Sequence, residues 1–397
     1  MGNQRQAWRM LALLGVAELL GMTPWFSATA VARGIVTEYH LTSAQTAWLT
    51  MAVQGGFVAG TLVSALLNLA DLLSARWVFA IGCVAAAGAN AMVTVAPSAL
   101  DAVAWRFATG AALALVYPPA MKIAAGWFKQ RRGAALGILI GCLTLGKALP
   151  YLLAAVSDGS WRSMMLLSSW CACAGGVLVA LTVSDGPYVS ASAPFNPSAA
   201  LAVFTRRGTR LAVLGYLGHM WELYAMWTWV GLYVTAAMHL QRQPAADHLG
   251  SLAAFVALGA GGAGCVVAGF WADRVGRARV AAWAMMASGT CCALTAAAFN
   301  APYLVLLLLV AVWGFSVVAD SAQFSAIVAE TSPDDYIGTA LTVQTCLGFL
   351  LTMFSISLTS MVAAWIGWQW AFLVILPGPV LGVQAMLALM RPRITRE

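Results

Sequence analysis

The sequence predicts an all-α membrane protein with twelve transmembrane helices, arranged as two six-helix halves related by pseudo-symmetry. Two observations carry this prediction. The 397 residues are 61% hydrophobic and 9% charged, whereas soluble domains are about 45–50% apolar and about 25% charged. In addition, apolar segments of about 20 residues, enough to cross a hydrocarbon core of about 30 Å as a helix, recur along the whole chain.

The predicted spans lie at residues 8–32, 44–67, 77–96, 99–127, 134–156, 162–183, 210–237, 250–271, 280–299, 302–329, 338–364 and 368–390. A transmembrane strand would be about 10 residues long and would alternate in polarity. These segments are longer and apolar on all sides, so helix is the structure that satisfies their backbone groups within the bilayer.

The positions of Lys and Arg predict the orientation. With the N-terminus inside, 15 of the 21 basic residues are cytoplasmic, Arg33, Arg162 and Arg242 are outside, and the remaining three lie within spans. Because basic residues are enriched in cytoplasmic loops, we expect a multi-pass protein of the cytoplasmic (inner) membrane with both termini in the cytoplasm. This topology explains the net charge of +7 without a nucleic-acid partner.

The two halves of the chain repeat each other. Asp71 and Arg76, in "LNLADLLSARW", match Asp273 and the arginines after it, in "AGFWADRVGRARV", at an offset of 273 − 71 = 202 residues. Other span starts recur at nearly the same offset, such as "RRGAALGI" and "YIGTALTV". We therefore predict an N-terminal half at 1–183, a cytoplasmic linker at 184–209, whose Pro, Ser and Ala content is typical of a linker, and a C-terminal half at 210–397.

The second charged cluster has the form Gly-x-x-x-Asp-Arg-x-Gly-Arg, made by Gly269, Asp273, Arg274, Gly276 and Arg277. With twelve spans and a half-length repeat, the chain resembles the major facilitator superfamily over essentially its whole length. The resemblance implies a bacterial transporter, of unresolved subfamily, that works by alternating access. The first copy keeps Asp71 and Arg76 but departs from the pattern at Leu67, Leu72 and Ser74.

Both clusters predict a cytoplasmic gate, formed by Asp71, Arg76, Gly269, Asp273, Arg274, Gly276 and Arg277. A carboxylate at the inner end of a span can accept hydrogen bonds from the first amides of a neighbouring helix and can pair with an arginine. Glycine allows the loop to turn sharply. The alternative is that these charges only set the topology.

Ionisable side chains inside the bilayer are costly, so each one predicts a functional site. Six lie within spans, and Tyr117 shares a face of span 4 with one of them; the candidates for substrate binding or proton coupling are Glu18, Arg106, Tyr117, Lys147, His219, Glu222 and Asp320. In the resembled fold, spans 1, 4, 7 and 10 line the central cavity. These spans carry all of the candidates except Lys147, which lies in span 5.

Each candidate also has a structural interpretation. Glu18 and Glu222, at corresponding places in the two halves, are either proton carriers or a pair that holds the bundle together. His219, one turn from Glu222, either tunes the pKa of Glu222 or simply forms the hydrogen bond that this buried carboxyl needs. Arg106 either serves the transport cycle or packs at the outer rim, and Asp320 is an alternative proton site or counter-ion. Lys147 needs an anionic partner, which is either a carboxylate of another helix or the substrate.

The sequence favours a small, anionic organic metabolite as substrate, because Arg106 and Lys147 are cations within the membrane. Proton symport is favoured over antiport, since span 5 keeps Gly137 and Gly146 of the drug-antiporter pattern but has Pro150-Tyr151 in place of its Gly-Pro pair. Drug or metabolite efflux, uniport or anion exchange, and a sensor without transport are the alternatives. No spacing typical of a nucleophile and base or a metal site occurs, and all eight cysteines lie in spans; we expect a monomer that is not an enzyme and has no metal or cofactor.

Overall fold

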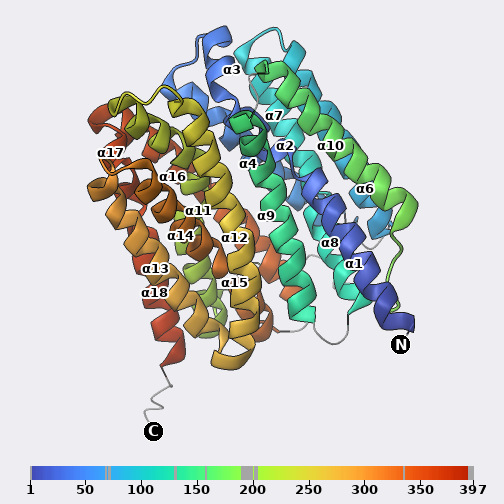
Figure 1. The fold of residues 1–397 in the computed structure, drawn as a ribbon. Helices are drawn as coiled ribbons and strands as arrows, with labels where there is room; N and C mark the ends of the chain where they lie inside the picture. The colour runs from blue at the N-terminus through green and yellow to red at the C-terminus, as the bar shows by residue number, and fades with distance from the viewer. Residues whose placement is uncertain are drawn as a thin grey trace.

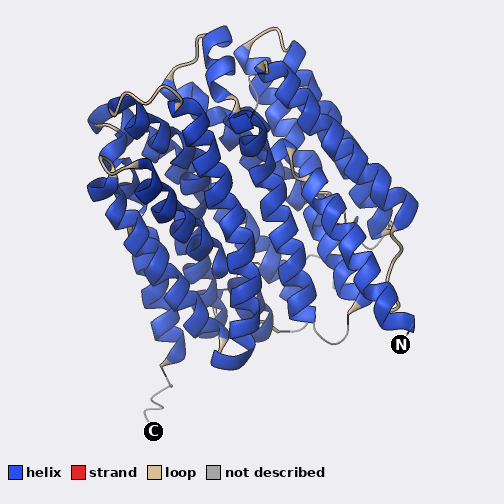
Figure 2. Cartoon of the chain, viewed as in Figure 1, coloured by secondary structure: helices blue, strands red, loops and turns tan. Residues whose placement is uncertain are grey.

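The protein is a bundle of helices, and the described residues contain no strand (Figures 1 and 2). A computed structural model describes residues 2–67, 69, 73–128, 132–156, 159–188, 200, 204–333 and 336–391. The first half contains α1 (Gly2–Gly21), α2 (Pro24–Ala30), α3 (Ala32–Tyr39), α4 (Ser43–Leu66), α6 (Ala75–Met92), η1 (Val93–Val95), α7 (Ala99–Leu113), α8 (Tyr117–Trp127), α9 (Arg132–Val156) and α10 (Trp161–Thr182). The second half contains α11 (Arg207–Leu240), α12 (Ala246–Val275), α13 (Arg277–Ala298), α14 (Tyr303–Ala319), α15 (Ser321–Thr331), α16 (Ile337–Ile366), α17 (Trp368–Ala371), η5 (Phe372–Ile375) and α18 (Pro377–Met390).

Eleven helical segments among the described residues are long and apolar enough to cross a membrane. They correspond to eleven of the twelve predicted spans. The predicted span at 210–237 is part of α11, a helix of 34 residues that is long enough but is not among the eleven. Its many Tyr and Trp residues, with His219 and Glu222, lower its hydropathy, and most of them are buried against other helices.

The two halves lie side by side, with the blue-to-green helices on one side of Figure 1 and the yellow-to-red helices on the other. They meet where α9 packs against α12 and where α4 packs against α16. At the first of these contacts a Cβ added to Gly262 of α12 would lie 3.1 Å from the carbonyl oxygen of Gly141 in α9. The backbones of the two halves therefore touch at this point.

Several spans are interrupted within their length, and three of these carry candidate residues. In these three spans, the breaks lie between α1 and α2, between α7 and α8, and at Asp320, between α14 and α15. Pro24 begins α2, and Pro118 and Pro119 lie in the first turn of α8; proline lacks the backbone N–H that a continuous helix needs. At the first break, Thr23 donates its hydroxyl to the carbonyls of Leu20 at 2.8 Å and Ser168 at 2.9 Å.

Contacts between the halves are well developed at the end of the bundle opposite the start of α1, which we call the outer end (Figure 1). Arg33, in α3, forms an ion pair with Asp247, in the first turn of α12. The neighbouring His248 lies 3.0 Å, through Nδ1, from the carbonyl oxygen of Ala155 near the end of α9. These contacts hold the outer ends of the halves together in this structure.

Candidate functional site

Lys147 lies between the two halves, in the part of α9 that leads to the outer end. Its side chain is 3% exposed. Its Nζ donates a hydrogen bond of 2.7 Å to the hydroxyl of Tyr224 in α11, and lies 3.9 Å from the ring centroid of Trp25, 5.1 Å from that of Tyr224 and 5.5 Å from that of Trp227. Cations within about 6 Å of an aromatic face are attracted to it. The ammonium group is therefore held by rings that come from both halves.

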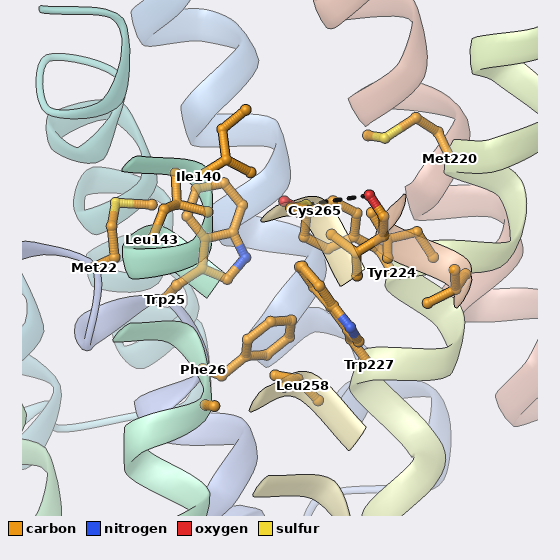
Figure 3. Packing of buried hydrophobic residues seen from close by; sticks show 14 of the residues in the cluster. Met22, Trp25, Phe26, Ile140, Leu143, Met220, Tyr224, Trp227, Leu258 and Cys265 are labelled. Atoms are coloured by element: carbon orange, nitrogen blue, oxygen red, sulfur yellow. Dashed lines mark hydrogen bonds between the residues drawn. The ribbon is translucent and has the colours of Figure 1, made fainter. Parts of the chain in front are cut away.

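These rings belong to a larger group, the central aromatic cluster, which consists of Trp25, Phe26, Phe57, Tyr151, Tyr224, Trp227 and Phe349. Figure 3 shows Trp25 and Phe26 of one half facing Tyr224 and Trp227 of the other. The centroids of Trp25 and Tyr224 are 5.8 Å apart, and those of Phe57 and Phe349 are 4.7 Å apart. The cluster thus fills the centre of the interface between the halves.

Glu18 lies where α1 crosses α9. The crossing is close because Gly146 faces the backbone of α1, where an added Cβ would lie 2.2 Å from the carbonyl oxygen of Leu19. Glu18 is fully buried, and neither of its carboxylate oxygens has a hydrogen-bond partner. It interacts electrostatically with Lys147 and with Tyr117. Glu18 is therefore within electrostatic range of two other sequence candidates, Lys147 and Tyr117.

Several buried polar atoms near the centre of the molecule also have no hydrogen-bond partner. They include the indole nitrogens of Trp25 and Trp227 and both side-chain polar atoms of Gln54 in α4. Gln54 lies one turn from Phe57 on the same face of α4, and Phe57 packs against Trp25 and Phe349. Buried polar groups are normally paired with protein groups or with ordered water, so these atoms are the ones left free to bond a water or another polar molecule. Gln54 is not among the candidates expected from the sequence, although an amide in the middle of an apolar span is a signal for such a residue.

Arg106 is fully buried, and it shares no hydrogen-bond partner with Lys147. Its guanidinium donates hydrogen bonds to three backbone carbonyls and two side-chain oxygens of the first half. The acceptors are Leu49 O (3.1 Å), Pro24 O (2.8 Å), Trp25 O (2.5 Å), Asn90 Oδ1 (2.8 Å) and Ser27 Oγ (3.3 Å). All of these partners are neutral. The guanidinium therefore joins α2, α4, α6 and α7, and it holds the backbone of Trp25.

His219 and Glu222 are on the same helix but bond in different directions. His219 Nδ1 lies 2.8 Å from Asp320 Oδ1, and its Nε2 lies 3.0 Å from the hydroxyl of Ser321. Glu222 accepts hydrogen bonds from Trp313 Nε1 at 2.7 Å and Ser288 Oγ at 2.8 Å. The spacing of His219 and Glu222 on one helix predicts that these two residues interact. The structure pairs His219 with Asp320, because the break between α14 and α15 places that carboxylate against α11.

The described residues of the predicted cytoplasmic gate are exposed or partly exposed, at the end of the bundle opposite the outer end. Asp71 lies outside the described residues, and Arg76 donates to Val183 O at 3.4 Å. Arg277 contacts Asp273 at 3.9 Å and Glu330 at 2.7 Å, all within the second half. Gly269 lies within α12 and Arg274 is exposed. Gly276 has φ of 94°, a value that favours glycine, and it separates α12 from α13.

The chain matches the sequence model of the Major Facilitator Superfamily over residues 13–267 and 223–397. No curated protein sequence matches it. Among solved structures, it is similar to a crystal structure of a point mutant of the nucleoside transporter NupG, with a TM-score of 0.74 and 16% identity over 96% of this chain and 100% of that one. A second crystal structure of NupG gives a TM-score of 0.72 and 15% identity over 97% and 100%.

The predicted fold class and the resemblance inferred from the charged motif are thus confirmed. The match between the family model and both halves of the chain also establishes that the protein is a transporter and not an enzyme, and that it crosses the membrane several times. The chain belongs to the Major Facilitator Superfamily.

Proposed function

We propose that the protein is a secondary active transporter that carries a small organic anion together with protons across the cytoplasmic membrane, with both termini and the segment 184–209 in the cytoplasm. The observation that carries this proposal is the position of Lys147. Its ammonium is buried between the halves, and its hydrogen-bond acceptor is the neutral hydroxyl of Tyr224. A buried ammonium that bonds a neutral group can exchange that group for an anion and gain an ion pair, in which both donor and acceptor are charged.

Glu18 provides the coupling to protons. Its carboxylate has no hydrogen-bond partner, and Lys147 is the cation that acts on it. When a substrate anion binds Lys147, it neutralises this cation, and a proton on Glu18 then becomes more favourable because an isolated buried charge is costly. The binding of anion and proton is therefore mutually favourable, which is the linkage that symport requires.

Uptake of mono- and dicarboxylates into proteoliposomes tests both parts. We expect uptake by the wild type to be driven by an inward proton gradient, with the lower pH outside the liposomes. Lys147→Gln should remain folded and lose binding of the carboxylate. Lys147→Arg should recover this binding only in part, because the guanidinium is wider and planar. Arg279→Gln, at an exposed position, is the matched control. Glu18→Gln should bind the anion but should no longer respond to the pH gradient. Normal uptake by the Lys147 variants would show that the lysine belongs to the scaffold.

A neutral nucleoside is the second candidate substrate, and the unpaired amide of Gln54 favours it. An amide donates and accepts, which suits a base or a ribose, and the fold is similar to that of the nucleoside transporter NupG. Uptake of uridine and adenosine by the wild type, Gln54→Leu and Lys147→Gln separates the candidates. A nucleoside carrier requires Gln54 and tolerates the lysine substitution.

A further inference from the structure

We propose that the anion recognised by Lys147 carries a planar aromatic ring, so that the substrate class is an aromatic or heteroaromatic carboxylate. This inference rests on the proposed function, because it places the ring of the substrate in the central aromatic cluster while its carboxylate binds Lys147.

The first observation is the composition of the surroundings of Lys147. Three rings face its Nζ within 3.9–5.5 Å. A site built for a small hydrated anion would offer polar groups and water around the ammonium. Here, a carboxylate that reaches Nζ must lie among ring faces, and the part of the molecule that carries the carboxylate must lie against them.

The second observation is that the rings come from both halves. Trp25 and Phe57 belong to the first half, and Tyr224 and Phe349 to the second. When the halves rock apart, the surfaces that separate at this point are aromatic faces. A planar ring can restore the offset and edge contacts that the cluster loses, and a saturated ring of the same size fits these contacts less well because it has no π face.

The third observation is the set of buried donors in the cluster. The indole nitrogens of Trp25 and Trp227 are buried and donate to no acceptor, and Figure 3 shows the indole nitrogen of Trp25 directed toward the second half. A carboxylate offers about four acceptor positions on two oxygens. It can therefore accept from Lys147 and from an indole at once, in place of the hydroxyl of Tyr224.

Four probes of similar or related shape test this inference by isothermal titration of the purified protein at neutral pH: benzoate, cyclohexanecarboxylate, benzamide and acetate. We expect benzoate to bind about tenfold more tightly than cyclohexanecarboxylate, since one or two aromatic contacts account for a ratio of this size. Acetate should bind more weakly than both. Benzamide, which keeps the ring but lacks the charge, should bind weakly.

Variants then locate the effect. Trp25→Phe keeps a ring and should retain the preference for benzoate, whereas Trp25→Leu should remove it. Because Trp25 is fully buried, a second variant with the same expected loss is Phe349→Leu, at a ring of the cluster that is 8% exposed. Trp365→Leu, at an exposed position, is the control.

The possible failures are distinct. Equal binding of benzoate and cyclohexanecarboxylate, or no binding of benzoate while other carboxylates bind in a Lys147-dependent manner, overturns the aromatic class and leaves the anion transporter standing. Benzamide binding as tightly as benzoate, with no effect of Lys147→Gln, overturns the proposed function and this inference together.

Discussion

The Nδ1 atom of His219 in α11 lies 2.8 Å from Oδ1 of Asp320, the residue at which α14 gives way to α15. Both side chains are at most 2% exposed. His219→Ala leaves a buried acid without its partner, and we expect a loss on the order of 3–5 kcal/mol in the free energy of unfolding. Adding Asp320→Ala should recover part of this loss.

Denaturant unfolding in detergent measures the two single variants and the double variant. His239→Ala changes a histidine that is 55% exposed and is the control. Strictly additive losses would show that the two residues do not act as a pair.

Arg106 is expected to stabilise the first half and not to bind substrate. Its five acceptors surround a planar guanidinium, whereas an ammonium cannot donate in the same directions. Arg106→Lys should therefore lower the free energy of unfolding by about 3 kcal/mol, the contribution of one or two hydrogen bonds to a charged group. The folded fraction should transport with an unchanged KM. Arg279→Lys, at an exposed arginine, is the control, and a large rise in KM at preserved stability would contradict this role.

The stability of the folded protein should fall at acidic pH because Glu38 becomes protonated. This residue of α3 accepts from Arg162 and from the indole of Trp161, and these hydrogen bonds hold the pKa of Glu38 below its ordinary value. A carboxyl whose pKa is lower in the folded state stabilises that state above its unfolded pKa, and this contribution is lost as the pH falls through the folded pKa. Melting temperatures should be measured from neutral pH down to about pH 3, a range that includes the pKa of about 4.3 expected for Glu in the unfolded chain. They should fall more steeply for the wild type than for Glu38→Gln. Parallel curves would refute the assignment.

The ion pair between Arg33 and Asp247 should bias the protein toward closure at its outer end. Its side chains are 73% and 46% exposed, and exposed pairs contribute about 0–1 kcal/mol. Asp247→Asn should therefore raise labelling of an introduced outer cysteine by no more than about fivefold, and salt should reduce the difference. The charge-swapped pair Arg33→Asp with Asp247→Arg should restore the original level. If the swapped pair behaves like the single variant, the contact does not govern closure.

The sequence was sufficient for the fold because length and apolarity determine a transmembrane helix almost alone. Prolines lie at the first two of the breaks described above, and Pro377 begins α18 in the last span. The break at Asp320 has no proline next to it, and the sequence showed only an acid within a span. Its consequence, the contact with His219, could not be predicted because helical spacing relates residues on one helix and says nothing about the side chains of another.

The sequence identifies Lys147 and Glu18 because charge is rare within a bilayer, and Glu18 is one of the partners that it allows for Lys147. The bonding of Arg106 was not predictable in the same way, since its main partners are backbone carbonyls that no residue type reveals. Gln54 and the aromatic surroundings of Lys147 depend on how two halves, distant in sequence, meet. The cytoplasmic gate remains a prediction, and the described contacts of Asp273 and Arg277 lie within one half.

The contact between Gly141 and Gly262 has a consequence for the rate at which the halves move. Where side chains interlock, a rotation must lift each one out of the space between its neighbours, and this creates a barrier. Two glycines present a smooth surface, so α9 and α12 can roll over each other while their separation stays constant. A bulky residue at either position would hold the two helices apart. It would slow the exchange between states more than it alters the affinity of either state for substrate.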